Sequence, residues 1–245
     1  MADLGAQHAE LWSLLADLDP PGWAAASPCE GWDVADVVLH LHQTDELALA
    51  SLRGDLAAEI ETFMRAGDDA VDAAAAASVA GERGRAGAEV GAAWNASAAA
   101  LRARLAGTDP SARLQWVVGT LTARTLAATR LAECWIHTTD VATALGTAVD
   151  PTPRLRHVAR LAWRTVPYAF ARAGRDLHGT VAVDLVGPDG TPWRFGLDDE
   201  PVTVVRGSGA DFCAVAGRRL DPAAADLVAT GPDAAAVLAL VRTYA

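Results

Sequence analysis

Apolar residues recur at helical spacing through most of the first 145 residues. Leucines repeat near this spacing in residues 3–17, and the segment Pro20–Gly22 predicts the end of that helix. Asp33 precedes an apolar stripe, with Asp36 three residues later, which is the pattern of a helix N-cap. A second helix is therefore expected from Asp33 to about Leu52.

Alanine dominates residues 55–105, where glycines near position 67 and over 81–91 mark breaks. Because alanine is the best helix former, two more helical pieces are expected in this region. The last long helix of the first half is expected over residues 122–145, where Gly146 ends it. The first half of the chain is therefore predicted to be helical.

The pattern changes after residue 150. Residues 154–172 predict one more helix, and TVAVDLVGPDGTPWRFG (180–196) alternates apolar and polar positions around a Pro-Asp-Gly turn, as a β-hairpin does. The remaining expected elements are a strand over 202–207, a helix from Ser208 to about Arg219, a strand over 226–230 and a helix from Ala234 to Tyr244. This order predicts an α+β protein with two domains, 1–150 and 151–245.

Composition indicates a folded, acidic protein. Of the 245 residues, 51% are hydrophobic and 21% are charged, which is typical of a globular protein with a core. The formal net charge is −11, so nucleic acid, which requires a basic surface, is not an expected partner. All 20 basic residues are arginine, which excludes Schiff-base chemistry on a lysine.

The cellular location is expected to be cytoplasmic. The three cysteines contain no C-x-x-C pair, and an odd number argues against a disulfide framework. The first residues carry no secretory signal, and no apolar run approaches the roughly 18 residues of a membrane span. No membrane partner is expected, and the sequence leaves the oligomeric state open.

The segment RLAECWIHTTD, residues 130–140, carries a polar stripe. Arg130, Glu133, His137 and Asp140 recur at intervals of three, four and three, so they share one face of the predicted helix. One interpretation is a solvated stripe with an ion pair inside the helix. The other is a metal site, because two ligands four residues apart, with a third from another element, form a three-ligand site with an open position.

The third ligand is expected in VVLHLHQTDE, residues 37–46, which offers His40 and His42. The two histidines flank the apolar stripe on opposite sides, so periodicity leaves both open. Two histidines and one glutamate are a ligand set of catalytic zinc, and two histidines with a carboxylate also suit iron.

Two motifs together resemble those of the mycothiol-dependent maleylpyruvate isomerase family. They are GWDVADVVLHL (31–41) and RLAECWIHTTDVATALG (130–146), and DFCAVAGRR (211–219) matches the family's C-terminal helix. The resemblance covers nearly the whole chain and is nearest to an uncharacterised actinobacterial subgroup. It implies a DinB-like four-helix bundle over 1–150 and a small, mixed, sterol-carrier-like domain over 151–245.

The same resemblance implies which residues act. The family binds a divalent metal through one histidine and an E-x-x-x-H pair, which correspond here to His40, Glu133 and His137. Zinc is favoured, and nickel, iron and manganese also suit this ligand set. Asp140 is implied beside the ligands, where it holds an imidazole or a bound water. Arg218 matches a family arginine implicated in activity, although a cation near a helix C-terminus has an equally simple structural explanation.

The implied function is that of a metal-dependent, thiol-using isomerase or S-transferase. The metal activates a low-molecular-weight thiol, with mycothiol as the candidate, for addition to a small electrophilic substrate. One alternative is a thiol-independent metal-hydroxide hydrolase or lyase, with Asp45 or Asp140 as general base. The other is a non-catalytic small-ligand-binding protein, stabilised by a closed four-ligand metal that His42 or Cys29 completes.

Three residues near the motifs have simpler expected roles. Arg130 is expected to pair with Glu133 or to face an anionic substrate. Cys134 points about 100 degrees away from Glu133 around the helix, so it is expected to pack in the core. Cys29 lies in the loop before the helix that carries His40, and it too is expected to pack as a small buried residue.

Overall fold

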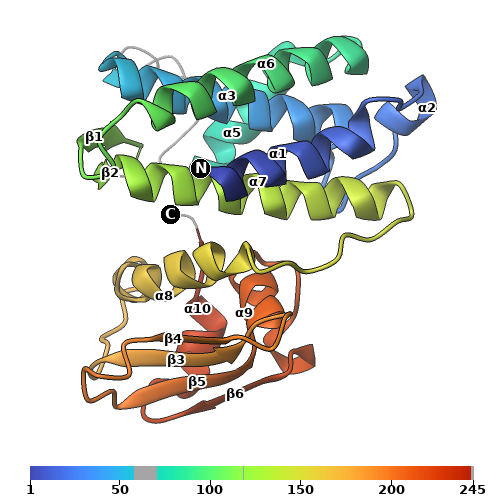
Figure 1. Cartoon of the computed structure of the whole chain (residues 1–245). Helices are drawn as coiled ribbons and strands as arrows, with labels where there is room; N and C mark the ends of the chain where they lie inside the picture. Colours follow the sequence, from blue (N-terminus) through green and yellow to red (C-terminus); the bar gives the residue numbers. More distant parts are fainter. Residues whose placement is uncertain (58–70, 118, 244–245) are drawn as a thin grey trace. The chain divides into compact units, whose positions relative to one another are not determined.

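The computed structural model describes residues 1–57, 71–117 and 119–243, which form two compact units, Met1–Val149 and Asp150–Ala245 (Figure 1). The first unit is mainly helical and the second combines helices with a sheet, so the predicted α+β class is confirmed. The break predicted near Gly67 lies outside the described residues. Across these residues, the helices lack a stretch with the length and hydrophobicity of a membrane span.

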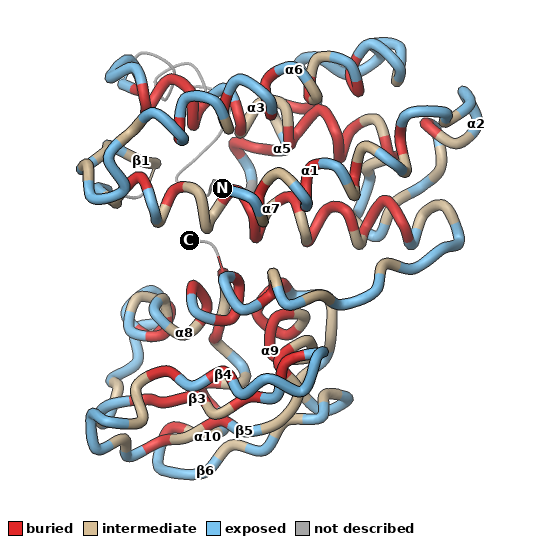
Figure 2. The backbone as a smooth tube through the Cα atoms, in the orientation of Figure 1, coloured by how far each residue is buried: buried red, intermediate tan, exposed pale blue. Residues whose placement is uncertain are grey.

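Long helices dominate the first unit. Its elements are α1 (Ala2–Leu15), α2 (Pro20–Trp23), α3 (Val34–Arg53), α5 (Val71–Glu82), α6 (Gly87–Ala106), β1 (Arg113–Trp116), β2 (Gly119–Thr122) and α7 (Ala123–Ala144). Helix α3 packs against α6 and α7, and α1 packs against the same two helices. Buried positions recur along these four helices (Figure 2), and their core includes Leu11, Leu41, Trp94 and Val141.

Helix α3 begins where the sequence predicted. The Asp33 side chain accepts a hydrogen bond from the Asp36 backbone N–H at 2.8 Å, and the Asp36 carboxylate accepts one from the Asp33 N–H at 3.4 Å. This reciprocal capping box confirms the predicted N-cap. The helix ends at Gly54, whose φ of 90° lies in the left-handed region that glycine adopts easily.

Trp23 packs directly on the start of α6. A Cβ atom added at Gly87 or Gly91 would overlap the Trp23 indole, so only glycine allows this approach. Two of the glycines predicted to break the helix therefore lie inside α6, and the left-handed turn falls at Gly84, where φ is 96°. The segment Pro20–Gly22 likewise does not simply end a helix, because it opens the short α2, which Asp19 caps.

The hairpin of β1 and β2, which precedes α7, was not predicted from the sequence. Arg113 pairs with Thr122 and Trp116 pairs with Gly119 in an antiparallel register. The hairpin leads directly into α7, because Thr122 is both the last residue of β2 and the N-cap of the helix. Helix α7 matches its predicted range and carries the polar stripe.

The second unit is a four-stranded sheet with helices. Its elements are α8 (Leu155–Arg172), β3 (Val181–Val186), β4 (Pro192–Phe195), β5 (Thr203–Ser208), α9 (Gly209–Ala216), the 3₁₀ helix η1 (Pro222–Ala224), β6 (Leu227–Thr230) and α10 (Ala234–Leu240). The strand order is β4-β3-β5-β6, with β3 and β5 parallel and the outer pairs antiparallel. The predicted hairpin is confirmed by β3 and β4, whereas α9 ends at Ala216, before the predicted Arg219.

Candidate metal centre

Helices α3 and α7 bring the three predicted ligands together. His40 lies on α3, and Glu133 and His137 lie one turn apart on α7. The Nε2 atom of His40 lies 3.0 Å from Oε1 of Glu133, and Nε2 of His137 lies 3.4 Å from the same oxygen. The two imidazole rings meet edge to face, with centroids 5.1 Å apart. His42 does not join them, because its Nδ1 lies 3.0 Å from the hydroxyl oxygen of Ser97.

The spacing of these donor atoms fits a metal ion. One donor from each of His40, Glu133 and His137 lies within 4.8 Å of the others. In tetrahedral zinc sites, metal–ligand distances of roughly 2.0–2.2 Å place two nitrogen or oxygen ligands about 3.4 Å apart. The separations of 3.0 and 3.4 Å around Oε1 of Glu133 are close to that value. The two imidazoles and the carboxylate are therefore arranged like the ligands of a metal site.

The polar face of α7 is buried, so the interpretation as a solvated stripe is wrong. Arg130 is 3% exposed, His137 is 7% exposed and Asp140 is fully buried. This face packs against α3, which places His40 beside Glu133 and Asp45 beside Arg130. Glu133 is the most exposed of the three candidate ligands, with 21% of its side chain accessible, so solvent reaches the site beside this carboxylate.

Electrostatics make this cluster favourable for a cation. Burial opposes ionisation of Glu133, but hydrogen bonds from His137 and His40 hold its pKa well below the ordinary value. Burial also opposes a charge on His137, but hydrogen bonds to Asp140, Cys29 and Glu133 raise its pKa well above the ordinary value. Burial lowers the pKa of His40. The lowered pKa keeps Glu133 as a carboxylate, and this negative charge favours a bound cation.

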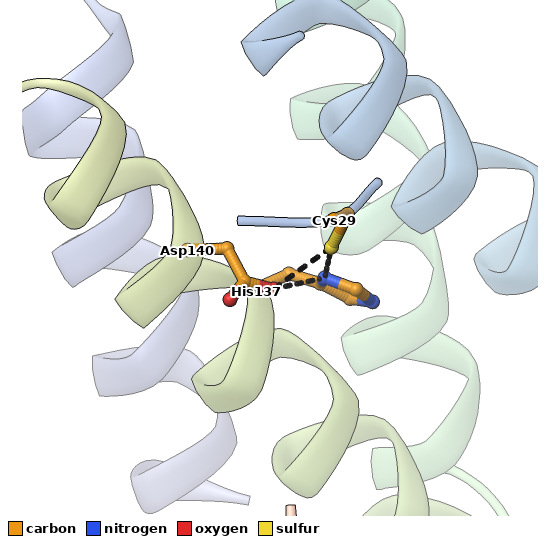
Figure 3. A group of neighbouring side chains, drawn as sticks. All are labelled: Cys29, His137 and Asp140. Carbon is orange, nitrogen blue, oxygen red and sulfur yellow. Dashed lines mark hydrogen bonds and ion pairs between the residues drawn. The ribbon is translucent and has the colours of Figure 1, made fainter. Parts of the chain in front are cut away.

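The second nitrogen of His137 contacts Asp140 and lies near Cys29 (Figure 3). Its Nδ1 lies 2.9 Å from Oδ2 of Asp140, and the Cys29 thiol donates to the same oxygen at 3.3 Å. Asp140 therefore contacts the imidazole nitrogen of His137 that does not face Glu133. Cys29 does not simply pack in the core, because its Sγ lies 4.0 Å from Nδ1 of His137. A local sequence pattern could not predict this contact, because 108 positions separate Cys29 and His137.

A tight turn positions Cys29 and Trp32. The Trp32 N–H donates to the Cys29 carbonyl at 3.0 Å, and Gly31 between them has a φ of 74°, a value that favours glycine. The Arg83 guanidinium donates to the Gly31 carbonyl at 3.0 Å and pairs with Asp36 at 2.8 Å. The Trp32 ring lies 5.3 Å from the His40 ring, between centroids, so the same turn also packs on a candidate ligand.

Arg130 does not pair with Glu133. Its Nε donates to Oδ1 of Asp45 at 2.9 Å, and its Nη2 donates to the Thr44 hydroxyl at 2.8 Å. Asp45 is 2% exposed, and burial raises its pKa while the Arg130 guanidinium opposes that shift. Because this pair joins residues 85 positions apart, helical periodicity did not predict it.

The other predicted residues make different contacts. Arg218 belongs to the second unit, follows α9 with a φ of 60°, and its Nη1 donates to the Ala239 carbonyl at 2.9 Å. Cys134 is 1% exposed and packs in the core as predicted, and burial raises the pKa of its thiol.

Comparisons with known proteins agree with this architecture. The chain is 33% identical, over 252 aligned positions, to two uncharacterised proteins from two strains of Mycobacterium tuberculosis, covering 100% of this chain and 95% of each relative. A crystal structure of the mycothiol-dependent maleylpyruvate isomerase superposes with a TM-score of 0.59 at 17% identity, covering 94% of this chain and 90% of that one. A mutant of the same enzyme gives 0.57 at 18% identity, covering 89% and 87%.

The two structural matches establish a shared fold, and a family model supplies the assignment. The model described as the mycothiol maleylpyruvate isomerase N-terminal domain matches residues 4–142, which is more than half of the chain and includes α3 and most of α7. The protein therefore belongs to the mycothiol maleylpyruvate isomerase N-terminal domain family.

Proposed function

We propose that this protein is a divalent-metal-dependent enzyme that uses a low-molecular-weight thiol of the mycothiol class. The thiol would add to a small electrophilic substrate, with cis–trans isomerisation if it is later expelled and S-transfer if it is retained. The observation that carries the proposal is the convergence of donor atoms of His40, Glu133 and His137 within 4.8 Å, where α3 packs against α7. The mycothiol-dependent isomerase that shares the fold supports the thiol class.

We also propose a more specific fold description for each unit. The mutual packing of α1, α3, α6 and α7 supports a DinB-like four-helix bundle for the first. The four-stranded sheet with α8, α9 and α10 supports a sterol-carrier-like fold for the second.

The candidate ligands suit an ion of borderline softness. Zinc is the proposed ion, and nickel, iron and manganese also accept two imidazoles and a carboxylate. A divalent metal bound there supplies Lewis acidity, which keeps a coordinating thiol in its thiolate form. His40, Glu133 and His137 hold the ion, Asp140 orients the His137 ring, and Trp32 covers His40. A metal held by three ligands would keep a coordination position for the thiol, and solvent reaches this group beside Glu133, whose side chain is 21% exposed.

Two other residues are assigned with the proposal. Asp140 acts on the ligand His137 through its hydrogen bond, so it is a positioning residue. We propose that the Arg218 guanidinium binds an anionic group of the substrate or thiol, in keeping with the family motif DFCAVAGRR. The Arg218→Lys variant keeps the positive charge but not the two-pronged guanidinium. A raised KM for an anionic substrate in this variant would indicate bidentate binding, and an unchanged KM would indicate that charge alone suffices.

The two alternative functions receive less support from the geometry. A hydrolase would need a free general base, but Asp45 is paired with Arg130 and Asp140 contacts Nδ1 of His137. A closed structural site would need a fourth ligand on the Nε2 side of His137. His42 contacts Ser97 instead, and Cys29 lies near Nδ1 on the opposite side of the ring. An open three-ligand site therefore agrees better with the contacts.

Adduct formation tests the proposal directly. Purified protein, loaded with zinc and mixed with mycothiol and chlorodinitrobenzene, is expected to accelerate adduct formation only when metal and thiol are both present. The assay follows absorbance of the adduct. His42→Ala is the matched control, because His42 lies on the same helix and contacts Ser97 rather than the site. A rate that is the same without zinc or without protein would exclude thiol activation at this site.

Asp140→Asn is expected to weaken zinc binding at the His40–Glu133–His137 group by about 10- to 100-fold. The neutral amide is a poorer acceptor for Nδ1–H of His137, so the imidazole becomes a weaker ligand and its ring is less firmly oriented. Competition with a chromophoric chelator measures the change, and circular dichroism checks that the fold is intact. An unchanged zinc affinity would mean that Asp140 has no effect on the metal site.

A further inference from the structure

A second group of metal-ligand side chains lies on the other side of His137. Cys29 Sγ, His137 Nδ1 and Asp140 Oδ2 lie within 4.8 Å of one another (Figure 3). Nδ1 to Oδ2 is 2.9 Å, Sγ to Oδ2 is 3.3 Å and Sγ to Nδ1 is 4.0 Å. A thiol, an imidazole and a carboxylate are three ligand types that zinc accepts.

We propose that Cys29, His137 and Asp140 form a second metal position, selective for a thiophilic divalent ion such as zinc, cadmium or cobalt. When this position and the His40–Glu133–His137 position are both filled, His137 bridges them as an imidazolate, with one metal on each ring nitrogen. Binding at the second position releases two protons to solvent, one from the Cys29 thiol and one from His137. The thiolate distinguishes this position from the first, because soft sulfur ligands disfavour manganese and magnesium.

The distances agree with tetrahedral coordination. In such a site a sulfur ligand lies about 3.6 Å from each nitrogen or oxygen ligand, and these lie about 3.4 Å from each other. The three measured separations fall on both sides of these values, so small side-chain rotations suffice to bring the donors around an ion. Only Cys29 is partly exposed, since side-chain exposure is 9% for His137 and 1% for Asp140. The ion would therefore enter from the side of Cys29.

The loop that carries Cys29 is already ordered for this role. The turn from Cys29 to Trp32 is closed by its own hydrogen bond and joined to Arg83 through Gly31. The Ser27 hydroxyl also accepts from the Cys29 N–H at 3.2 Å. Because Cys29 is already held in place, less conformational entropy is lost when it coordinates an ion. Asp140 and His137 come from a long helix, which is equally fixed.

A simpler explanation for Cys29 is that its thiol only donates a hydrogen bond to Asp140. Serine would serve that purpose as well, because a hydroxyl is a better donor than a thiol. Serine is a poor ligand for a thiophilic ion, however. The Cys29→Ser variant therefore keeps the hydrogen bond and removes the proposed ligand, and so it separates the two explanations.

The test is titration of the metal-free full-length protein with Co²⁺, followed by visible and near-ultraviolet absorption. The native protein is expected to bind two equivalents and to show a thiolate-to-cobalt charge-transfer band. Cys29→Ser is expected to lose that band and one equivalent, while Cys134→Ala retains both equivalents and the band, because Cys134 packs in the core. Manganese is expected to bind with one equivalent in both native protein and Cys29→Ser.

The His40→Ala variant separates this inference from the proposed function. It is expected to keep the charge-transfer band and lose the other equivalent. A native protein without the band, or a band that survives in Cys29→Ser, would overturn the second position. A native protein that binds a single equivalent with the band, unaffected by His40→Ala, would support the Cys29 position and contradict the ligand set used for the proposed function.

Discussion

Alanine in place of His40, Glu133 or His137 is expected to remove the first metal equivalent from the purified protein. Each substitution deletes one of three ligands, so the loss of affinity should exceed the roughly 10- to 100-fold that follows from loss of a ligand's hydrogen-bond partner. His137→Ala is expected to have the largest effect, because this imidazole belongs to both groups of candidate ligands. Elemental analysis of zinc-supplied preparations measures the loss.

The matched control for this series is His42→Ala, which removes an imidazole two residues from His40 without touching the group. It is expected to retain its metal. Native protein that is metal-free in zinc-supplied preparations, and ligand variants that keep the native free energy of unfolding, would show that His40, Glu133 and His137 form only a hydrogen-bonded cluster. The proposed enzyme would then have no metal centre.

Arg130→Ala is expected to lower the free energy of unfolding by about 3–5 kcal/mol. The substitution leaves the Asp45 carboxylate, which is 2% exposed, without its guanidinium partner. Oδ2 of Asp45 already makes no hydrogen bond within residues 1–57, 71–117 and 119–243, so no second partner is in place to compensate. Urea unfolding followed by circular dichroism measures the loss of free energy. The dependence of that free energy on urea concentration is expected to stay unchanged.

Two further variants define the cause of this effect. Arg104→Ala removes an exposed arginine from α6 and is expected to change the free energy of unfolding by less than about 0.5 kcal/mol. The double variant Arg130→Met with Asp45→Leu removes both buried charges and is expected to recover most of the loss. If Arg130→Ala were as stable as Arg104→Ala, the buried ion pair would contribute little to the fold.

The features predicted from sequence have local causes. Asp33 and Asp36 determine the start of α3 within a single turn, and the period of three and four residues places Glu133 and His137 on one face of α7. The turn between β3 and β4 is equally local. His40 and His42 differ only in which neighbouring helix they face, so periodicity left both open, and the family resemblance favoured the one that the structure places beside Glu133.

The features that sequence reasoning missed depend on tertiary contacts. Arg130 was expected to find a carboxylate on its own helix, but it reaches Asp45 on α3, because a buried guanidinium pairs with the carboxylate that is also buried. Cys29 lies beside Asp140 only because the loop before α3 folds over the end of α7. The glycines at the start of α6 are explained by Trp23, which is distant in sequence.

Because the candidate ligands come from two helices, a metal ion bound to them would make the stability of the first unit depend on metal supply. His40 on α3 and Glu133 on α7 are 93 positions apart, so the unfolded chain does not hold them together. An ion that binds only the folded state adds about 2.7 kcal/mol when its free concentration is about 100 times the dissociation constant. With such an ion, the fraction of folded protein would follow the free metal concentration in the medium, so thermal stability would serve as a gauge of metal availability.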